Sequence, residues 1–150
     1  MTSSAEDDPV VPGGTYRVLM SIALLGTELG DFAAATEIAA VLKELRPDLP
    51  HASTVLGVSA FSQGKFEAGL RLLEEAVQAF PDFQMGKAMV AVCMDQLNKP
   101  GWRDILESVI DDGRDENAVG LACVLLQRHP PNAASEEIMP VGLPANAMWA

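Results

Sequence analysis

The side chains that most often carry catalysis are few in this sequence, and their spacing does not assemble a reactive centre. The 2 histidines, His51 and His129, each adjoin a proline, so a Ser-His-Asp arrangement would have to be built from loop positions. Ser59 lies in a Gly-Val-Ser segment that lacks the second glycine of a nucleophile elbow and falls inside a helical pattern. We therefore predict no catalytic residues and no enzyme activity.

Ligands for phosphate or metal ions are equally sparse. Gly86 and Lys87 lack both the upstream glycine and the following Ser or Thr of a phosphate-binding loop. Cys93 and Cys123 have no close metal-ligand spacing, and the acids within residues 111–116 lack the alternating oxygen ligands of a calcium loop. We predict no metal site and no cofactor, and we interpret both cysteines as reduced thiols packed in helices.

The charge balance argues against nucleic acids and membranes as partners. The 150 residues contain 10 Lys and Arg against 21 Asp and Glu, which gives a net charge of -11 at pH 7. Such a chain repels phosphate backbones and anionic lipids. Its longest uncharged helical stretch, residues 18–27, is far shorter than the roughly 18 apolar residues of a membrane span. Because acids also stand where a signal peptide is basic, we predict a cytoplasmic protein that binds neither nucleic acid nor membranes.

A 34-residue repeat organises the chain. Gly30 and Gly64 stand 34 residues apart. The same offset separates Phe32 from Phe66, Ala35 from Gly69, Pro47 from Pro81, and Asp48 from Asp82. A turn residue, an aromatic residue, a small residue and a helix-ending proline thus recur in one order. This is the period of tetratricopeptide (TPR) helical hairpins.

Each repeat unit predicts two helices. The apolar pattern predicts helices over residues 16–29 and 32–46, then 52–63 and 65–80, then 84–97. Asp31 is the predicted cap of the second helix. The sixth helix is expected to start late, at Trp102, because Pro100 occupies the position of the expected aromatic residue. A helix over residues 116–127 is predicted to cap the last exposed apolar face.

The predicted fold is therefore all-α, a TPR-like array of about three helical hairpins, the third irregular, with a C-terminal capping helix. We predict a flexible segment over residues 1–14, a TPR-like domain over residues 15–129, and a proline-containing tail over residues 130–150. Two interpretations of the tail stay open: a floppy end, or an extended segment that docks back into the groove of the array. Exposed apolar end faces also allow a homodimer, through Leu121, Val124 and Leu125.

The first helix of each hairpin lines the concave side of such arrays, so the repeat predicts a partner-binding groove. The predicted groove residues are Arg17, Met20, Leu24, Thr27, Glu28, His51, Thr54, Val58, Phe61, Met85, Ala88, Val92, Asp95 and Gln96.

The character of this groove favours an amphipathic helix as its ligand. Arg17 is its only cation, which is too few to replace the water around a peptide carboxylate. The other members are mainly apolar and include the adaptable Met20 and Met85, and an apolar trough suits the apolar stripe of a helix. Side chains such as Leu24, Val58 and Val92 fit a role in the core between repeats equally well.

Several motifs carry a family resemblance. The chain contains Phe80-Pro81-Asp82-Phe83, Gln84-Met85-Gly86-Lys87-Ala88, Cys93 and Gly101-Trp102-Arg103, with Gly30-Asp31-Phe32 and Leu45-Arg46-Pro47 in the first hairpin. In this combination, residues 16–112 resemble the small TPR-like Hrp B/K family of bacterial type III secretion systems. In size, acidity and plan the chain more distantly resembles the needle-subunit co-chaperones of such systems (YscG-like), which hold an aggregation-prone helical subunit in an apolar groove.

The resemblance implies a cytoplasmic, non-enzymatic accessory protein of this virulence-associated apparatus. We expect a chaperone or co-chaperone that binds an amphipathic helical needle or pilus subunit in the groove, with or without a small co-chaperone. The alternative is a non-enzymatic scaffold or regulatory adaptor of the secretion apparatus. Such an adaptor would contact a large component through its convex surface, through the turn at residues 111–116, or through the tail.

Overall fold

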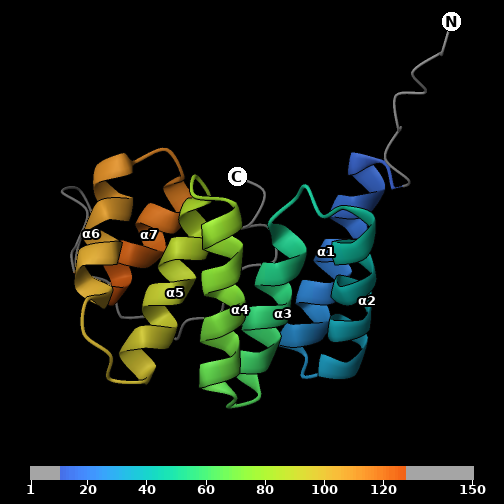
Figure 1. Ribbon diagram of the computed structural model, residues 1–150, viewed down its shortest axis with the longest axis horizontal. Coiled ribbons are helices and arrows are strands. Elements are labelled where there is room, and N and C mark those ends of the chain that lie inside the picture. The colour runs from blue at the N-terminus through green and yellow to red at the C-terminus, as the bar shows by residue number, and fades with distance from the viewer. Residues whose placement is uncertain (1–10, 128–150) are drawn as a thin grey trace, which may run out of the picture.

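The computed structural model of the chain describes residues 11–127, which form seven α-helices (Figure 1). The helices are α1 (Gly13–Glu28), α2 (Phe32–Leu45), α3 (His51–Ser62), α4 (Phe66–Ala79), α5 (Gln84–Gln96), α6 (Trp102–Asp112) and α7 (Glu116–Leu125). No strand occurs within residues 11–127. The predicted all-α class is confirmed, and the arrangement is consistent with a TPR-like helical array.

The helices pair in sequence order and stack along one direction. Three hairpins, α1–α2, α3–α4 and α5–α6, follow one another, and the second helix of each packs on the first helix of the next. Consecutive odd-numbered helices, from α1 to α7, also contact each other and form one layer. In Figure 1, α2 and α4 lie in front of α1 and α3, and α7 packs on α5 and α6.

The hairpin turns repeat in detail. Gly30, Gly64 and Asn98 are spaced 34 residues apart, and all have positive φ values of 81°, 78° and 52°. One backbone hydrogen bond closes each turn, from the N–H of the following residue to the carbonyl five positions earlier: Asp31 to Gly26 (2.8 Å), Lys65 to Ala60 (2.9 Å) and Lys99 to Met94 (2.8 Å). Glycine and asparagine are the residues that tolerate this backbone conformation best. The repeat therefore includes a third turn residue, Asn98, that the sequence analysis did not identify.

The third hairpin is irregular for the predicted reason. The helices α2 and α4 begin at Phe32 and Phe66, but α6 begins at Trp102, two residues later than the repeat requires. Pro100 and Gly101 fill the longer turn, and Gly101 adopts a φ of 93°. Asp31 caps α2 as expected, because its carboxylate accepts a hydrogen bond from the N–H of Ala34 (3.2 Å).

Small residues allow α3 and α4 to cross closely. A Cβ at Gly69 would lie 2.9 Å from the carbonyl oxygen of Gly57, and a Cβ at Gly57 would lie 2.6 Å from Cγ of Leu73. Two apolar clusters surround this crossing. One joins α1, α2 and α3, the other joins α4, α5, α6 and α7, and Phe83 packs against both. The middle hairpin thus connects the two halves of the core.

The start of α1 differs slightly from the prediction. The helix begins at Gly13, three residues before the predicted Tyr16. The chain before it is held in place: Val11 is buried, and its carbonyl accepts a hydrogen bond from Nη1 of Arg46 (3.1 Å). Residues 1–10 and the predicted tail over residues 130–150 lie outside the described residues, as does His129. None of the described helices is long and apolar enough to cross a membrane.

Candidate partner-binding site

The predicted groove residues all lie on α1, α3 and α5, the first helices of the three hairpins. The structure divides them by exposure. Six side chains are buried in the core, namely Met20, Leu24, Thr27, Thr54, Met85 and Ala88. Arg17, Glu28 and Gln96 are exposed, and His51, Val58, Phe61, Val92 and Asp95 are half-buried. The partner-binding role of the set stays a prediction, and its accessible part is smaller than the sequence analysis expected.

The accessible apolar part consists of Val58 and Phe61 on α3 and Val92 on α5, which we call the inner wall. All three pack against the second apolar cluster while part of each side chain reaches solvent. Phe61 is further held by an edge-to-face contact with Phe66, with ring centroids 5.0 Å apart. The inner wall is therefore a supported apolar surface that a partner could extend.

An aromatic row supports the layer of first helices. The hydroxyl oxygen of Tyr16 on α1 accepts a hydrogen bond from the N–H of Ala52 on α3 (3.2 Å). The His51 ring lies edge-on to Tyr16 and to Phe83, with centroid distances of 6.1 Å and 5.4 Å. Burial raises the pKa of Tyr16, which stays protonated at neutral pH. These rings connect the three hairpins, so His51 has a packing role in addition to its predicted place in the groove.

The side chains considered for chemistry have packing roles. Ser59 is buried between α2 and α3, with its Oγ 3.4 Å from Oγ1 of Thr36. Cys93 is fully buried, and burial, aided by the negative charge of Glu74, raises its thiol pKa from 9.0 to about 12. A neutral thiol of this kind is a poor nucleophile. Within the described part of the chain, no group of three or more His, Cys, Asp or Glu is placed to hold a metal ion.

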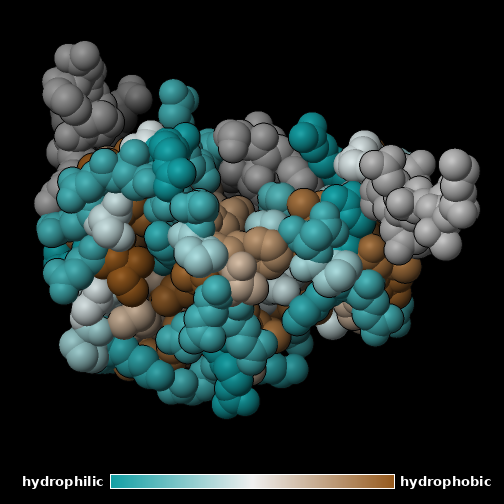
Figure 2. All heavy atoms as spheres, turned by 45° about the horizontal axis from the view of Figure 1, so that its top comes forward, coloured by the Kyte–Doolittle hydropathy of each residue, from teal (hydrophilic) through white to brown (hydrophobic). Residues whose placement is uncertain are grey.

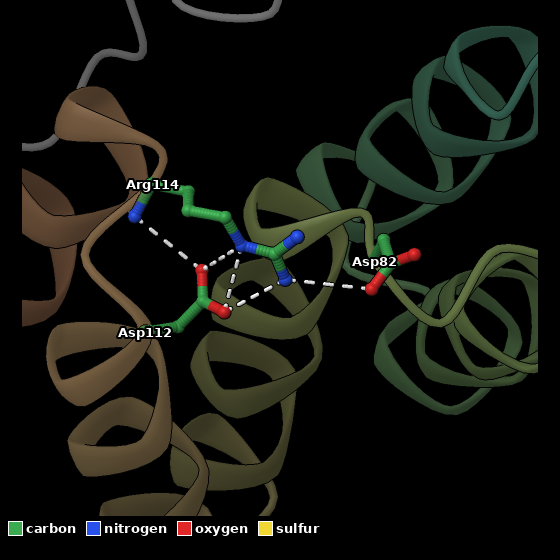
Figure 3. Close-up of polar contacts among 3 residues, drawn as sticks. All are labelled: Asp82, Asp112 and Arg114. Atoms are coloured by element: carbon green, nitrogen blue, oxygen red, sulfur yellow. Dashed lines mark hydrogen bonds and ion pairs between the residues drawn. The ribbon is translucent and has the colours of Figure 1, made fainter.

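The acids of residues 111–116 organise the turn before α7. Asp115 caps α7 by accepting hydrogen bonds from the N–H groups of Asn117 and Ala118 (both 3.1 Å). The Arg114 guanidinium donates to Asp112 at 2.7 Å and reaches Asp82, in the turn between α4 and α5, at 3.4 Å (Figure 3). Arg114 also lowers the pKa of Asp112. The turn is thus tied to the preceding hairpin.

Six of the seven large hydrophobic side chains that are exposed within residues 11–127 lie in the first hairpin, and the sequence analysis did not identify them as a surface. Val18, Ile22 and Leu25 on α1 and Leu29, its C-cap residue, follow a spacing of four, three and four residues. Their exposed fractions are 60%, 49%, 48% and 76%. Val41 and Leu45 on α2 are also exposed. We call these six residues the N-terminal end face. Figure 2 shows hydrophobic surface at this end of the molecule.

A signal for this face was present in the sequence. The apolar pattern of residues 16–29 predicted a helix, and apolar periodicity alone does not say which side of a helix is covered. Because α1 is the first helix of residues 11–127, no described hairpin packs on its outer side. At the opposite end, Leu121 is buried and Leu125 half-buried, which leaves Val124 as the only exposed member of the predicted dimer contact.

Comparisons with known proteins give one match. The family model described as bacterial type III secretion protein (HrpB1_HrpK) matches residues 10–131, which include every described helix. No curated protein and no solved structure matches the chain.

Proposed function

Because the chain belongs to the HrpB1_HrpK family of bacterial type III secretion proteins, we propose that it is a chaperone or co-chaperone of that apparatus. Its ligand is an amphipathic helical subunit of the needle or pilus, held along the layer of α1, α3 and α5. It acts by covering the apolar stripe of the subunit, without catalysis. Such cover prevents polymerisation before export, since exposed apolar helical faces drive association.

The observation that carries this proposal is the inner wall. Val58, Phe61 and Val92 present apolar atoms to solvent on the layer of first helices, and each is packed from behind. Such a wall matches the contact that an amphipathic helix makes with an apolar groove. The net charge of -11 supports the same role, because an acidic coat keeps a complex of this kind in solution.

The direct test is co-expression with the needle or pilus subunit of the same secretion system, followed by size-exclusion chromatography with light scattering. We expect a low-order complex in which the subunit stays soluble. Val58→Asp should abolish the complex while circular dichroism shows unchanged helicity. Val124→Asp, which places the same charge at an exposed site on α7, is the matched control and should leave the complex intact.

Two results would contradict the chaperone role. The first is aggregation of the subunit while the protein elutes alone, which would favour the alternative of a scaffold or regulatory adaptor that binds a large component of the apparatus. The second is equal complex formation by wild type and Val58→Asp, which would exclude the inner wall as the contact.

The compartment is part of the proposal. We expect cell fractionation to recover the protein with a cytoplasmic marker, since the subunit must be covered before export. Recovery with a periplasmic marker would place the binding step after transport across the inner membrane. It would contradict the cytoplasmic assignment and leave the helix-binding surface in place.

A further inference from the structure

Three residues of the N-terminal end face, Val18, Ile22 and Leu25, occupy positions that are interfaces in the rest of the array. By the 34-residue offset, Val18, Ile22 and Leu25 of α1 correspond to other residues of α3 and α5. Their counterparts are Ala52, Leu56 and Ser59 on α3, and Gly86, Val90 and Cys93 on α5. Five of these six counterparts are buried, and Leu56 is half-buried. This side of the first helix is therefore covered in the second and third hairpins and exposed in the first.

An α-helix provides the cover in both internal cases. On α3, Ser59 contacts Thr36 of the preceding α2, with the two hydroxyl oxygens 3.4 Å apart. On α5, a Cβ at Gly86 would lie 3.2 Å from Cγ2 of Val77, which belongs to the preceding α4. These contacts show the ligand that this side of a first helix accepts: a second helix packed along it.

The apolar character of the exposed face is specific to the first hairpin. Val41 and Leu45 correspond by the same offset to Glu75 and Ala79 of α4, which are exposed as well. The second hairpin therefore presents a charged and a small residue to solvent at the positions where the first presents two large apolar ones. A surface that only needed to be soluble would follow the second pattern.

The rim of the face is acidic. Glu28 on α1 and Glu37 and Glu44 on α2 are exposed and lie within one helical turn of Leu25 or Val41. Arg17 corresponds in the repeat to His51 and Met85 on the inner layer, and Lys43 corresponds to Val77. The two cations on α1 and α2 therefore point to other sides of the hairpin, and Arg46, just after α2, pairs with Asp48. A second copy would bring one acidic rim against another, whereas a basic partner would neutralise it.

We propose that the N-terminal end face docks an amphipathic helix of the bound protein, with an apolar stripe flanked by Lys or Arg. The helix lies along α1 in the place that α2 takes on α3 and α4 takes on α5. The inference rests on the proposed function, because it assigns a second contact to the same helical partner. In this arrangement, the partner helix adds one more helix to the array, next to α1.

The test uses the full-length protein and two synthetic peptides of roughly 18 residues, about five helical turns. Both carry leucine at every third or fourth position; one has lysine and the other glutamate beside the stripe. Fluorescence anisotropy should show saturable binding of the lysine peptide and roughly tenfold weaker binding of the glutamate peptide. Leu25→Asp should weaken the lysine peptide by at least about tenfold. Val124→Asp, at an equally exposed residue (48% for both), should not.

Three outcomes would overturn the docking face. They are equal loss of peptide binding in Leu25→Asp and Val124→Asp, unchanged binding in Leu25→Asp, and a wild-type dimer by light scattering that Leu25→Asp converts to a monomer. The last would assign the face to a second copy.

The chaperone role and the docking face can be refuted independently of each other. A complex with the secretion subunit that survives Leu25→Asp but is lost in Val58→Asp would refute the docking face and support the chaperone role. Peptide binding that depends on Leu25, without any subunit complex, would refute the chaperone role and support the docking face.

Discussion

The two ends of the array are finished in different ways. At the C-terminal end, α7 packs on α5 and α6. The exposed residues on it are Glu116, Gly120 and Val124, and Gln127 is exposed just after it. At the N-terminal end, the corresponding outer surface carries Val18, Ile22, Leu25 and Leu29, all exposed. One end therefore has a helix of mixed polarity as its cap, and the other presents a continuous apolar stripe.

This difference suits a polar cap at the C-terminal end and the proposed docking face at the N-terminal end. Stacked repeats need terminal units with a polar outer face for solubility, and α7 largely provides one. The first hairpin has the buried side of an internal repeat on its exposed face, although its own inner side is well packed around Tyr16, Met20 and Leu42. This apolar surface on a well-packed hairpin is the basis of the docking face proposed above.

A large loss of stability that affects both ends of the array is expected at the crossing of α3 and α4. Gly69→Val would drive a side chain against the backbone of Gly57 and Phe61, 2.9 Å and 3.1 Å from the new Cβ. Backbone atoms cannot move aside, so we expect a loss of about 3 kcal/mol in the free energy of unfolding, measured in urea. Both apolar clusters should unfold together.

The control for this substitution is at the C-terminal end. A Cβ at Gly120, which is exposed on α7, meets nothing within 4 Å, so Gly120→Ala should stabilise the protein by roughly 0.5–1 kcal/mol through helix propensity. Equal destabilisation by both substitutions would show that the α3–α4 crossing has no special place in the array.

A second experiment separates the core from the N-terminal end face. Leu106 is fully buried, so Leu106→Ala should cost about 2–5 kcal/mol. Leu29, the most exposed residue of the end face at 76%, should change stability by less than about 0.5 kcal/mol when replaced by alanine. A large loss in Leu29→Ala would mean that the end face is covered in solution.

The fold could be predicted well from the sequence, because the repeat includes glycines and prolines that strongly constrain the local backbone. Gly30 and Gly64 end helices through positive φ, and Pro47 and Pro81 follow the ends of second helices. Even the irregular start of α6 at Trp102 follows from Pro100. The third turn at Asn98 escaped notice because asparagine is a weaker signal than glycine for the same backbone conformation.

The site was harder to predict, because apolar periodicity reports a helical face but not what covers it. Met20 and Val18 lie on the same helix and are both apolar, yet the first is fully buried and the second is 60% exposed. Only the stacking of hairpins distinguishes them. The predicted groove therefore included core residues such as Thr54 and Ala88, and the apolar pattern of α1 predicted a helix but no exposed surface.

Cys93 on α5 and Leu25 on α1 occupy the same position of the repeat. The side chain at this position is buried on α5 and exposed on α1, so the two residues allow these environments to be compared. Burial raises the Cys93 pKa from 9.0 to about 12, so its neutral form stabilises the fold fully below pH 9. That contribution is lost as the pH rises from 9 towards 12. The free energy of unfolding should fall over this range, and Cys93→Ala should remove part of the decline.

A reactivity measurement completes this comparison. In a background with Cys123→Ala, Leu25→Cys should react with a thiol reagent in the folded protein, while Cys93 reacts only on unfolding. Equal reactivity of the two thiols at neutral pH would contradict the difference in cover between the two positions.

The smallest effects are expected at two turn arginines, which occupy equivalent repeat positions near opposite ends. Arg46 pairs with Asp48 at 2.7 Å and also holds the carbonyl of Val11, and its side chain is 13% exposed. Arg114 pairs with Asp112 and Asp82, but its side chain is 63% exposed. Exposed pairs contribute little and are screened by salt. The urea midpoint should therefore fall more in Arg46→Ala than in Arg114→Ala, and 1 M NaCl should remove the Arg114 effect first. The reverse order would mean that the ion pairs of Arg114 before α7 stabilise the array more than the contacts of Arg46 with Asp48 and Val11 do.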